Sequence, residues 1–206
     1  MTGGLFVAGT DTSVGKTVVA ACLVKAMDGD YWKPVQSGLG DDADTATVAR
    51  LTGLSGDRLH PPAYEFTNPL SPHQAALLEG VAIDMERFQL PRTSRPLVVE
   101  GAGGLLVPLN DTHTMIDLII RLGLPVALVT RSGLGAINHT LLSLEALNAR
   151  AVSVIGVIVN GPSNPGNVEA IRHYGRVRVI FEMPELVPLD GAAVKRAAES
   201  LSGIPG

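Results

Sequence analysis

The stretch "LFVAGTDTSVGKTVVAACLVKAM" at residues 5–27 decides the fold. An apolar run breaks at Gly9 into a loop of Thr, Asp and Ser, and Gly15-Lys16-Thr17 then opens a helical pattern. Backbone amides in such a turn, together with the positive end of the following helix, form a cradle for anions. Gly9 and Gly15 enclose five residues, one more than the usual G-x-x-x-x-G-K-[ST] spacing. We still interpret the segment as a phosphate-binding loop, because Lys16 and Thr17 have little structural reason to stand together there.

Strand-like runs alternate with helical patterns along the rest of the chain. Strands are predicted at 5–9, 31–35, 96–100, 125–130, 154–160 and 178–183. Helices are predicted at 15–28, 43–53, 73–80, 114–123, 136–149, 166–174 and 190–201. Several of the strands are continuously apolar, as parallel strands buried on both faces are. We therefore expect an α/β fold of the P-loop NTPase type, with a mostly parallel sheet, helices on both of its faces and a single domain over residues 1–206. The stretch 54–95, rich in Pro and turn formers, is expected to be a surface excursion.

Composition excludes several classes of function. The net charge is −4 and no basic block occurs, which argues against a nucleic-acid partner. The single cysteine, Cys22, cannot form an internal disulfide. The first apolar run ends at Gly9, far short of a membrane span, so we expect a cytoplasmic protein with no membrane partner.

Ligands of parallel sheets bind beyond the carboxyl ends of the strands, and charged side chains stand at those places here. Lys33 lies in the second apolar strand, where it either reaches solvent or directs a cation into the same cleft as Lys16. The "DDAD" run that follows holds Asp41, Asp42 and Asp44, which are either a cap and a solvated cluster or the source of one magnesium ligand.

The later strands end in further candidates. Glu100 ends the third strand and resembles the acid that faces a metal ion in phosphate-transfer ATPases. The glycines that follow it let a backbone approach a ligand closely. The turn 133–138 opens another helix and suits a carboxylate. Asn160 ends the fifth strand, as a turn former or as a reader of a purine base.

Four motifs resemble the dethiobiotin synthetase family in the family's own order: "GTDTSVGKT" (9–17), "YWKPVQSG" (31–38), "VVEGAGGLLVPL" (98–109) and "GLGAINHTLLSLEAL" (133–147). The resemblance implies a reaction that joins CO2 to 7,8-diaminononanoate through a carbamate and a carbamic–phosphoric anhydride, in biotin synthesis. ATP is the co-substrate, Mg2+ the metal, and dethiobiotin, ADP and phosphate the products. It also implies a homodimer that holds the carboxylate of the diamine near the partner's "GLGAIN" turn.

The resemblance assigns roles to individual residues. The catalytic residues it implies are Lys33, Lys16 and Thr12. The substrate-binding residues are Ser37, Thr12, Lys33, Gly103, Leu134, Gly135 and Asn138. The nucleotide-binding residues are Ser13, Val14, Gly15, Lys16, Thr17, Val18, Asp44, Glu100, Gly101, Ala102, Gly103, Asn160, Gly161, Pro184, Glu185 and Leu186. The magnesium ligands are Thr17, Asp44 and Glu100.

The main alternative is a regulatory or partitioning ATPase of the same P-loop branch. Such proteins usually carry a second lysine five residues before the loop lysine, and Asp11 stands at that position here.

Overall fold

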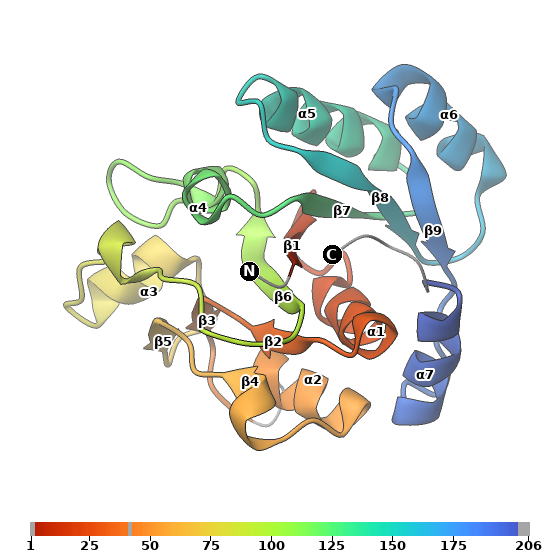
Figure 1. The fold of residues 1–206 in the computed structure, drawn as a ribbon. Coiled ribbons are helices and arrows are strands. Elements are labelled where there is room, and N and C mark those ends of the chain that lie inside the picture. Colours follow the sequence, from red (N-terminus) through yellow and green to blue (C-terminus); the bar gives the residue numbers. More distant parts are fainter. Residues whose placement is uncertain (1–2, 41–42, 202–206) are drawn as a thin grey trace.

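The computed structural model describes residues 3–40 and 43–201. Within these residues the central sheet has seven strands that pair in parallel, in the order β4-β2-β6-β1-β7-β8-β9 (Figure 1). The strands are β1 (Gly4–Gly9), β2 (Asp30–Trp32), β4 (Leu59–His60), β6 (Leu97–Gly104), β7 (Val126–Arg131), β8 (Val154–Asn160) and β9 (Val179–Met183).

Helices cover both faces of this sheet, because β1 is apolar on both sides. Leu5 and Val7 belong to a core with α1, α2 and α7, whereas Phe6 and Ala8 belong to a core with α4, α5 and α6. Figure 1 shows α5 and α6 on one side of the sheet and α1 and α7 on the other. The helices are α1 (Lys16–Met27), α2 (Asp44–Thr52), α3 (Pro72–Leu78), α4 (Met115–Leu122), α5 (Ala136–Asn148), α6 (Pro165–Gly175) and α7 (Gly191–Glu199). The predicted fold class and all seven predicted helices are confirmed.

The single strand predicted at 31–35 is wrong. β2 ends at Trp32, and the chain leaves the main sheet at Lys33 and Pro34. It then forms β3 (Val35–Ser37), which pairs with β5 (Tyr64–Phe66) in a separate two-stranded sheet. Proline has no N–H to donate to a strand ladder, which accounts for the break at Pro34. Lys33 therefore stands where the chain departs from the sheet.

The stretch 54–95 is more than the predicted surface excursion. It contains β4, β5, α3 and two short 3-10 turns, Gly56–Arg58 and Met85–Arg87. Phe66 and Phe88 from this stretch are almost completely buried in the core on the Phe6 face. The apolar residues between the prolines are thus buried against the sheet. The many prolines and turn formers around them interrupt the strand and helix patterns, so the sequence did not indicate this burial.

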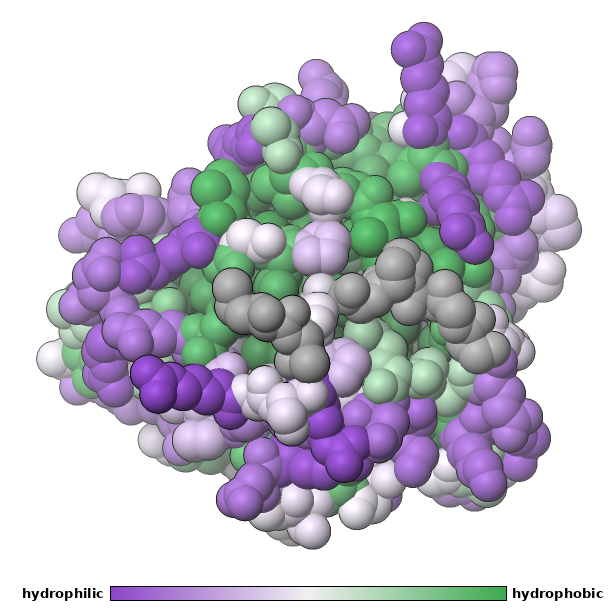
Figure 2. Space-filling model, in the orientation of Figure 1, coloured by the Kyte–Doolittle hydropathy of each residue, from purple (hydrophilic) through white to green (hydrophobic). Residues whose placement is uncertain are grey.

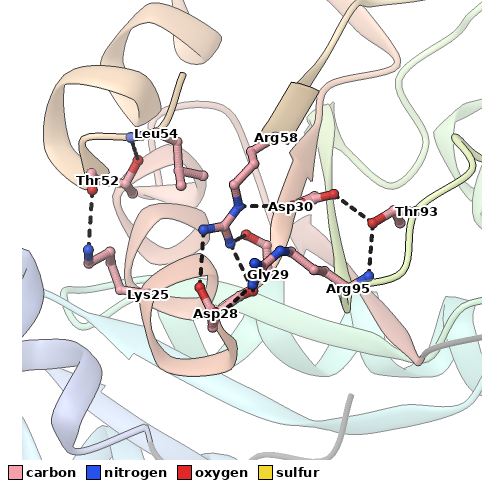
Figure 3. Close-up of polar contacts among 9 residues, drawn as sticks. All are labelled: Lys25, Asp28, Gly29, Asp30, Thr52, Leu54, Arg58, Thr93 and Arg95. Carbon is pink, nitrogen blue, oxygen red and sulfur yellow. Dashed lines mark hydrogen bonds and ion pairs between the residues drawn. The ribbon is translucent and has the colours of Figure 1, made fainter. Parts of the chain in front are cut away.

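An ion-pair cluster fastens the edge strand β4 to the turn between α1 and β2 (Figure 3). Arg58, just before β4, donates hydrogen bonds to the carbonyl oxygens of Asp28 and Gly29 and to the carboxylate of Asp30. Thr93 donates to the other oxygen of Asp30 at 2.6 Å. Burial alone would raise the pKa of Asp30, but the hydrogen bonds from Thr93, Arg58 and His60 outweigh it and hold this pKa below its usual value.

The surface mixes apolar and polar areas. Figure 2 shows hydrophobic residues at the middle of one face and hydrophilic residues around its margin. None of the helices among residues 3–40 and 43–201 is long and apolar enough to cross a membrane.

Candidate functional site

The loop between β1 and α1 has the backbone that an anion cradle needs. Gly15, directly before α1, has a φ of 94°, in the left-handed region. A Cβ atom on Gly15 would lie 2.0 Å from Nδ2 of Asn160, so only glycine fits. The Asn160 amide itself donates to the carbonyl oxygen of Val14 at 2.9 Å. Lys16 lies back across the loop, and its Nζ donates to the carbonyl oxygen of Asp11 at 2.8 Å.

Three neighbouring strands bring the predicted charged residues together. β1 carries the loop, β6 carries Glu100, and β2 leads directly into Lys33. Lys33 Nζ lies 2.5 Å from Asp44 Oδ2 and 3.1 Å from Glu100 Oε1. It also donates to the carbonyl oxygen of Gly101 at 3.3 Å. Parallel strands end at one edge of the sheet, and so residues far apart in sequence meet there.

Burial and neighbouring charges perturb these groups. Burial, with a smaller contribution from the Lys33 charge, lowers the pKa of Lys16 to about 8. Burial would also lower the pKa of Lys33, but the carboxylates of Glu100 and Asp44 outweigh it and raise this pKa above its usual value. Burial would raise the pKa of Asp44, but the charge and hydrogen bond of Lys33, a hydrogen bond from Thr17 and the charge of Lys16 outweigh it and lower this pKa. The cluster therefore holds its charges in pairs, although it is removed from water.

The oxygen atoms around Thr17 fit a magnesium ion. Thr17 Oγ1 lies 2.7 Å from Asp44 Oδ1 and 2.8 Å from Glu100 Oε1. A hydroxyl carries a single proton, so it donates to only one of these carboxylates, and the other oxygen pair repels unless a cation intervenes. Among the described residues no group of three or more His, Cys, Asp or Glu could hold a metal. Magnesium usually takes one or two carboxylates and completes its shell with phosphates and water, which suits this donor set.

A cavity of about 590 Å³ opens beside the loop and this cluster. It brings together most of the residues predicted from the sequence, namely Thr12, Ser13, Gly15, Lys16, Thr17, Val18, Lys33, Ser37, Asp44, Glu100, Ala102 and Gly103. Asp41 and Asp42 lie outside the described residues. Asp44, the described aspartate of the "DDAD" run, contacts Thr17.

Other predicted residues lie away from this cavity lining. Leu134, Gly135 and Asn138 stand at the start of α5, and Leu134 is fully exposed. Asn160 ends β8 and lines a smaller cavity of about 330 Å³. Gly161 follows it, and residues 184–186 follow β9. Their predicted roles stay predictions.

Sequence reasoning missed two parts of the site. The segment 69–72, together with Val107, forms a further wall of the cavity. The segment follows β5, a strand that the sequence analysis did not predict, so no sequence signal indicated it. Tyr31 was also missed, although it stands only two residues before Lys33; its hydroxyl donates to Glu100 Oε2 at 2.8 Å.

Comparison with known proteins identifies the family. A family model described as an AAA domain matches residues 3–193. The ATP-dependent dethiobiotin synthetase BioD of Paramagnetospirillum magneticum is 50% identical over 191 residues, which cover 93% of this chain and 92% of that protein. This chain belongs to the dethiobiotin synthetase family. The biotin biosynthesis bifunctional protein BioCD of Bordetella avium is 56% identical over 93% of this chain, which spans 41% of that longer protein. The family resemblance predicted from the four motifs is confirmed.

Solved structures with a similar fold are more distant from this dethiobiotin synthetase family member. The septum site-determining protein MinD of Pyrococcus horikoshii, solved with Mg-ADP, has a TM-score of 0.59 over 100% of this chain and 98% of that one, at 13% identity. A ParA family ATPase from Chlorobium tepidum has a TM-score of 0.55 at 17% identity, over 98% of this chain and 96% of that one. These likenesses show the fold alone. The synthetases at about 50% identity favour an enzyme over the partitioning ATPase.

Proposed function

We propose that this chain converts 7,8-diaminononanoate, CO2 and ATP to dethiobiotin, ADP and phosphate, as one domain. Membership of a family of ATP-dependent dethiobiotin synthetases supports the reaction. The observation that carries the proposal is the meeting of Lys16, Lys33, Asp44 and Glu100 around one cavity beside the phosphate loop. The switch ATPases usually carry their second lysine five residues before the loop lysine, whereas the second lysine here, Lys33, follows β2 and lines the cavity.

The proposed reaction has three steps. A neutral amine of the substrate attacks CO2 and loses a proton, which gives a carbamate. A carbamate oxygen then attacks the γ-phosphorus of ATP, the bond to the β–γ bridging oxygen breaks, and ADP leaves. Finally the second amine attacks the carbamoyl carbon and loses a proton to water, the bond to the phosphate oxygen breaks, and phosphate leaves with closure of the ring.

The chain's own residues orient these reactants and offset their charge. The backbone amides of the loop and Lys16 bind the phosphates of ATP. Lys33 lies at the cavity wall within reach of the carbamate and of the transferring phosphoryl group, whose oxygens gain negative charge. Thr12 and Ser37 line the same cavity and offer hydroxyl groups to the two amines. Positioning and charge stabilisation provide the catalysis, since no step requires a covalent bond to the protein.

Magnesium, when bound, would offset the charge of the β- and γ-phosphates. Thr17, Asp44 and Glu100 would hold it, because their oxygens converge within hydrogen-bond distance of Thr17 Oγ1. Glu100 to Gly103 would line the phosphate side, and Asn160, Gly161 and residues 184–186 would surround the base.

The proposed assembly is a homodimer. Leu134, Gly135 and Asn138 lie outside the cavity lining of their own chain. A second copy would bring them to the carboxylate of the diamine. Gly135 gives the start of α5 no side-chain cap, and the positive end of a helix suits a carboxylate. The expected cytoplasmic location stays a prediction.

The deciding experiment measures phosphate release from ATP and Mg2+ in the presence of bicarbonate, with and without the diamine. We expect release to depend on both the diamine and bicarbonate, with dethiobiotin formed in a ratio of one to one with phosphate. Release that is independent of the diamine would contradict the synthetase and support the switch ATPase.

A further inference from the structure

Tyr31 lies behind the charged cluster, in the core of the protein. It is fully buried in the middle of β2, and its register partner on the neighbouring strand β6 is Val98. Paired residues of neighbouring strands direct their side chains to the same face, so Tyr31 and Val98 share a face of the sheet. Lys33 is the first residue after β2, and both Tyr31 and Lys33 contact the carboxylate of Glu100.

The carboxylate of Glu100 is held at both of its oxygens. Oε1 lies 2.8 Å from Thr17 Oγ1 and 3.1 Å from Lys33 Nζ. Oε2 accepts a hydrogen bond of 2.8 Å from the Tyr31 hydroxyl. Oε1 faces the phosphate loop, while Tyr31 anchors the oxygen that faces the core.

The hydroxyl of Tyr31 has one proton, which it donates to Glu100 Oε2. A hydrogen bond to a carboxylate is stronger than one between neutral groups, and a buried hydroxyl is costly unless it is bonded. A phenylalanine would fill the same space in the apolar core without this requirement, so the hydroxyl matters for Glu100 rather than for packing.

We propose that Tyr31 is a positioning residue, which donates to Oε2 of Glu100 and thereby keeps Oε1 directed at Thr17, where the magnesium ion of the nucleotide would be held. This inference rests on the proposed function, because it assigns Glu100 to the magnesium shell. Tyr31 itself does not touch the reactants, since it lies outside the cavity lining.

The test compares Tyr31→Phe with Tyr64→Phe. Tyr64 is a matched control, because it is also buried in a strand and its hydroxyl contacts the backbone of Asp84, away from the cavity. Calorimetric titration measures the affinity for a non-hydrolysable ATP analogue in EDTA and in excess Mg2+. We expect wild type, Tyr31→Phe and Tyr64→Phe to bind the analogue with equal affinity in EDTA. The gain in affinity on adding Mg2+ should be about tenfold smaller in Tyr31→Phe than in wild type. Tyr64→Phe should keep the full gain.

A double-mutant cycle separates positioning from loss of structure. If Tyr31 acts through Glu100, the change Tyr31→Phe adds no further loss of the magnesium effect in a Glu100→Gln background. Equal magnesium effects in wild type and Tyr31→Phe, or additive losses in the cycle, would overturn the role of Tyr31 and leave the proposed function standing. A wild-type protein that gains nothing from Mg2+ would instead overturn the proposed metal site, and the inference with it.

Discussion

Lys33 and Glu100 form a buried ion pair of 3.1 Å, although they stand 67 residues apart in the chain. Their side chains are only 4% and 1% exposed. A buried charge that loses its partner is strongly destabilising, so each residue constrains what can replace the other. Both residues also line the cavity, so a substitution of either one affects the stability of this region and its proposed chemistry together.

Replacing Lys33 separates turnover from nucleotide binding. We expect Lys33→Ala to lower kcat by about a hundredfold or more, because the developing negative charge loses its cation. ATP affinity should stay within a few-fold, since the loop is unchanged, while the free energy of unfolding falls by about 3 kcal/mol. Diamine-dependent phosphate release, nucleotide titration and urea unfolding measure the three effects. Lys25→Ala is the control, because Lys25 lies near the far end of α1. A near-normal kcat in Lys33→Ala would show that Lys33 does not take part in the mechanism.

Replacing Glu100 tests the metal ligands. Glu100→Gln keeps the shape but removes the charge, so the Mg2+ concentration for half-maximal activity should rise by about tenfold or more. Metal titration of the rate measures this value. Glu169→Gln, on an exposed position of α6, provides the control. An unchanged metal titration in Glu100→Gln would show that Glu100 is not a ligand.

Replacing Gly15 tests whether the backbone conformation of the phosphate loop is needed for ATP binding. An alanine there is strained by the φ of 94° and collides with the Asn160 amide at 2.0 Å. We expect Gly15→Ala to weaken ATP binding by about tenfold or more, because the amides no longer converge on the phosphates. Gly53→Ala shares the left-handed backbone, with a φ of 71°, but its Cβ meets no atom within 4 Å. It should cost about 1 kcal/mol of stability and leave ATP affinity unchanged; equal ATP affinity in both variants would contradict the steric argument.

Replacing Asn160 tests whether this residue recognises the adenine base. Its Nδ2 is engaged by the Val14 carbonyl, which leaves Oδ1 to accept a hydrogen bond from the amino group of adenine. We expect Asn160→Ala to weaken ATP binding more than GTP binding, by several-fold in the ratio. Titration with both nucleotides measures this ratio. An equal loss for both would mean that Asn160 supports the loop and does not read the base.

Asp30 makes the stability of the protein depend on acid pH. Its folded pKa lies below that of the unfolded chain, so its contribution is present above about pH 4 and is lost as the pH falls through the folded value. Asp30→Asn should lower the free energy of unfolding by on the order of 2 kcal/mol at pH 7 and flatten its decline between about pH 5 and pH 3. Urea unfolding at each pH measures both quantities.

Asp28→Asn is the control for Asp30. Asp28 belongs to the same cluster but its side chain is 73% exposed, and exposed ion pairs contribute little. A larger loss of stability in Asp28→Asn than in Asp30→Asn would contradict the importance of burial here.

The sequence by itself determined the local elements and the kind of site. Strand, loop and helix at 5–27 follow from neighbouring residues, because periodicity, glycine and the Lys16-Thr17 pair act over short distances. The alternation of strands and helices also predicted the parallel sheet, although Glu100 does not end its strand as predicted, because β6 continues to Gly104.

Only the tertiary structure decided which side chains meet. The strand predicted at 31–35 breaks because Pro34 cannot donate to the ladder, and its second half finds a partner in β5. Strand order and helix packing bring Asp44 to Thr17, Tyr31 to Glu100 and the segment 69–72 to the cavity. These contacts join residues far apart in the chain, and no pattern of neighbouring residues encodes the distances between them.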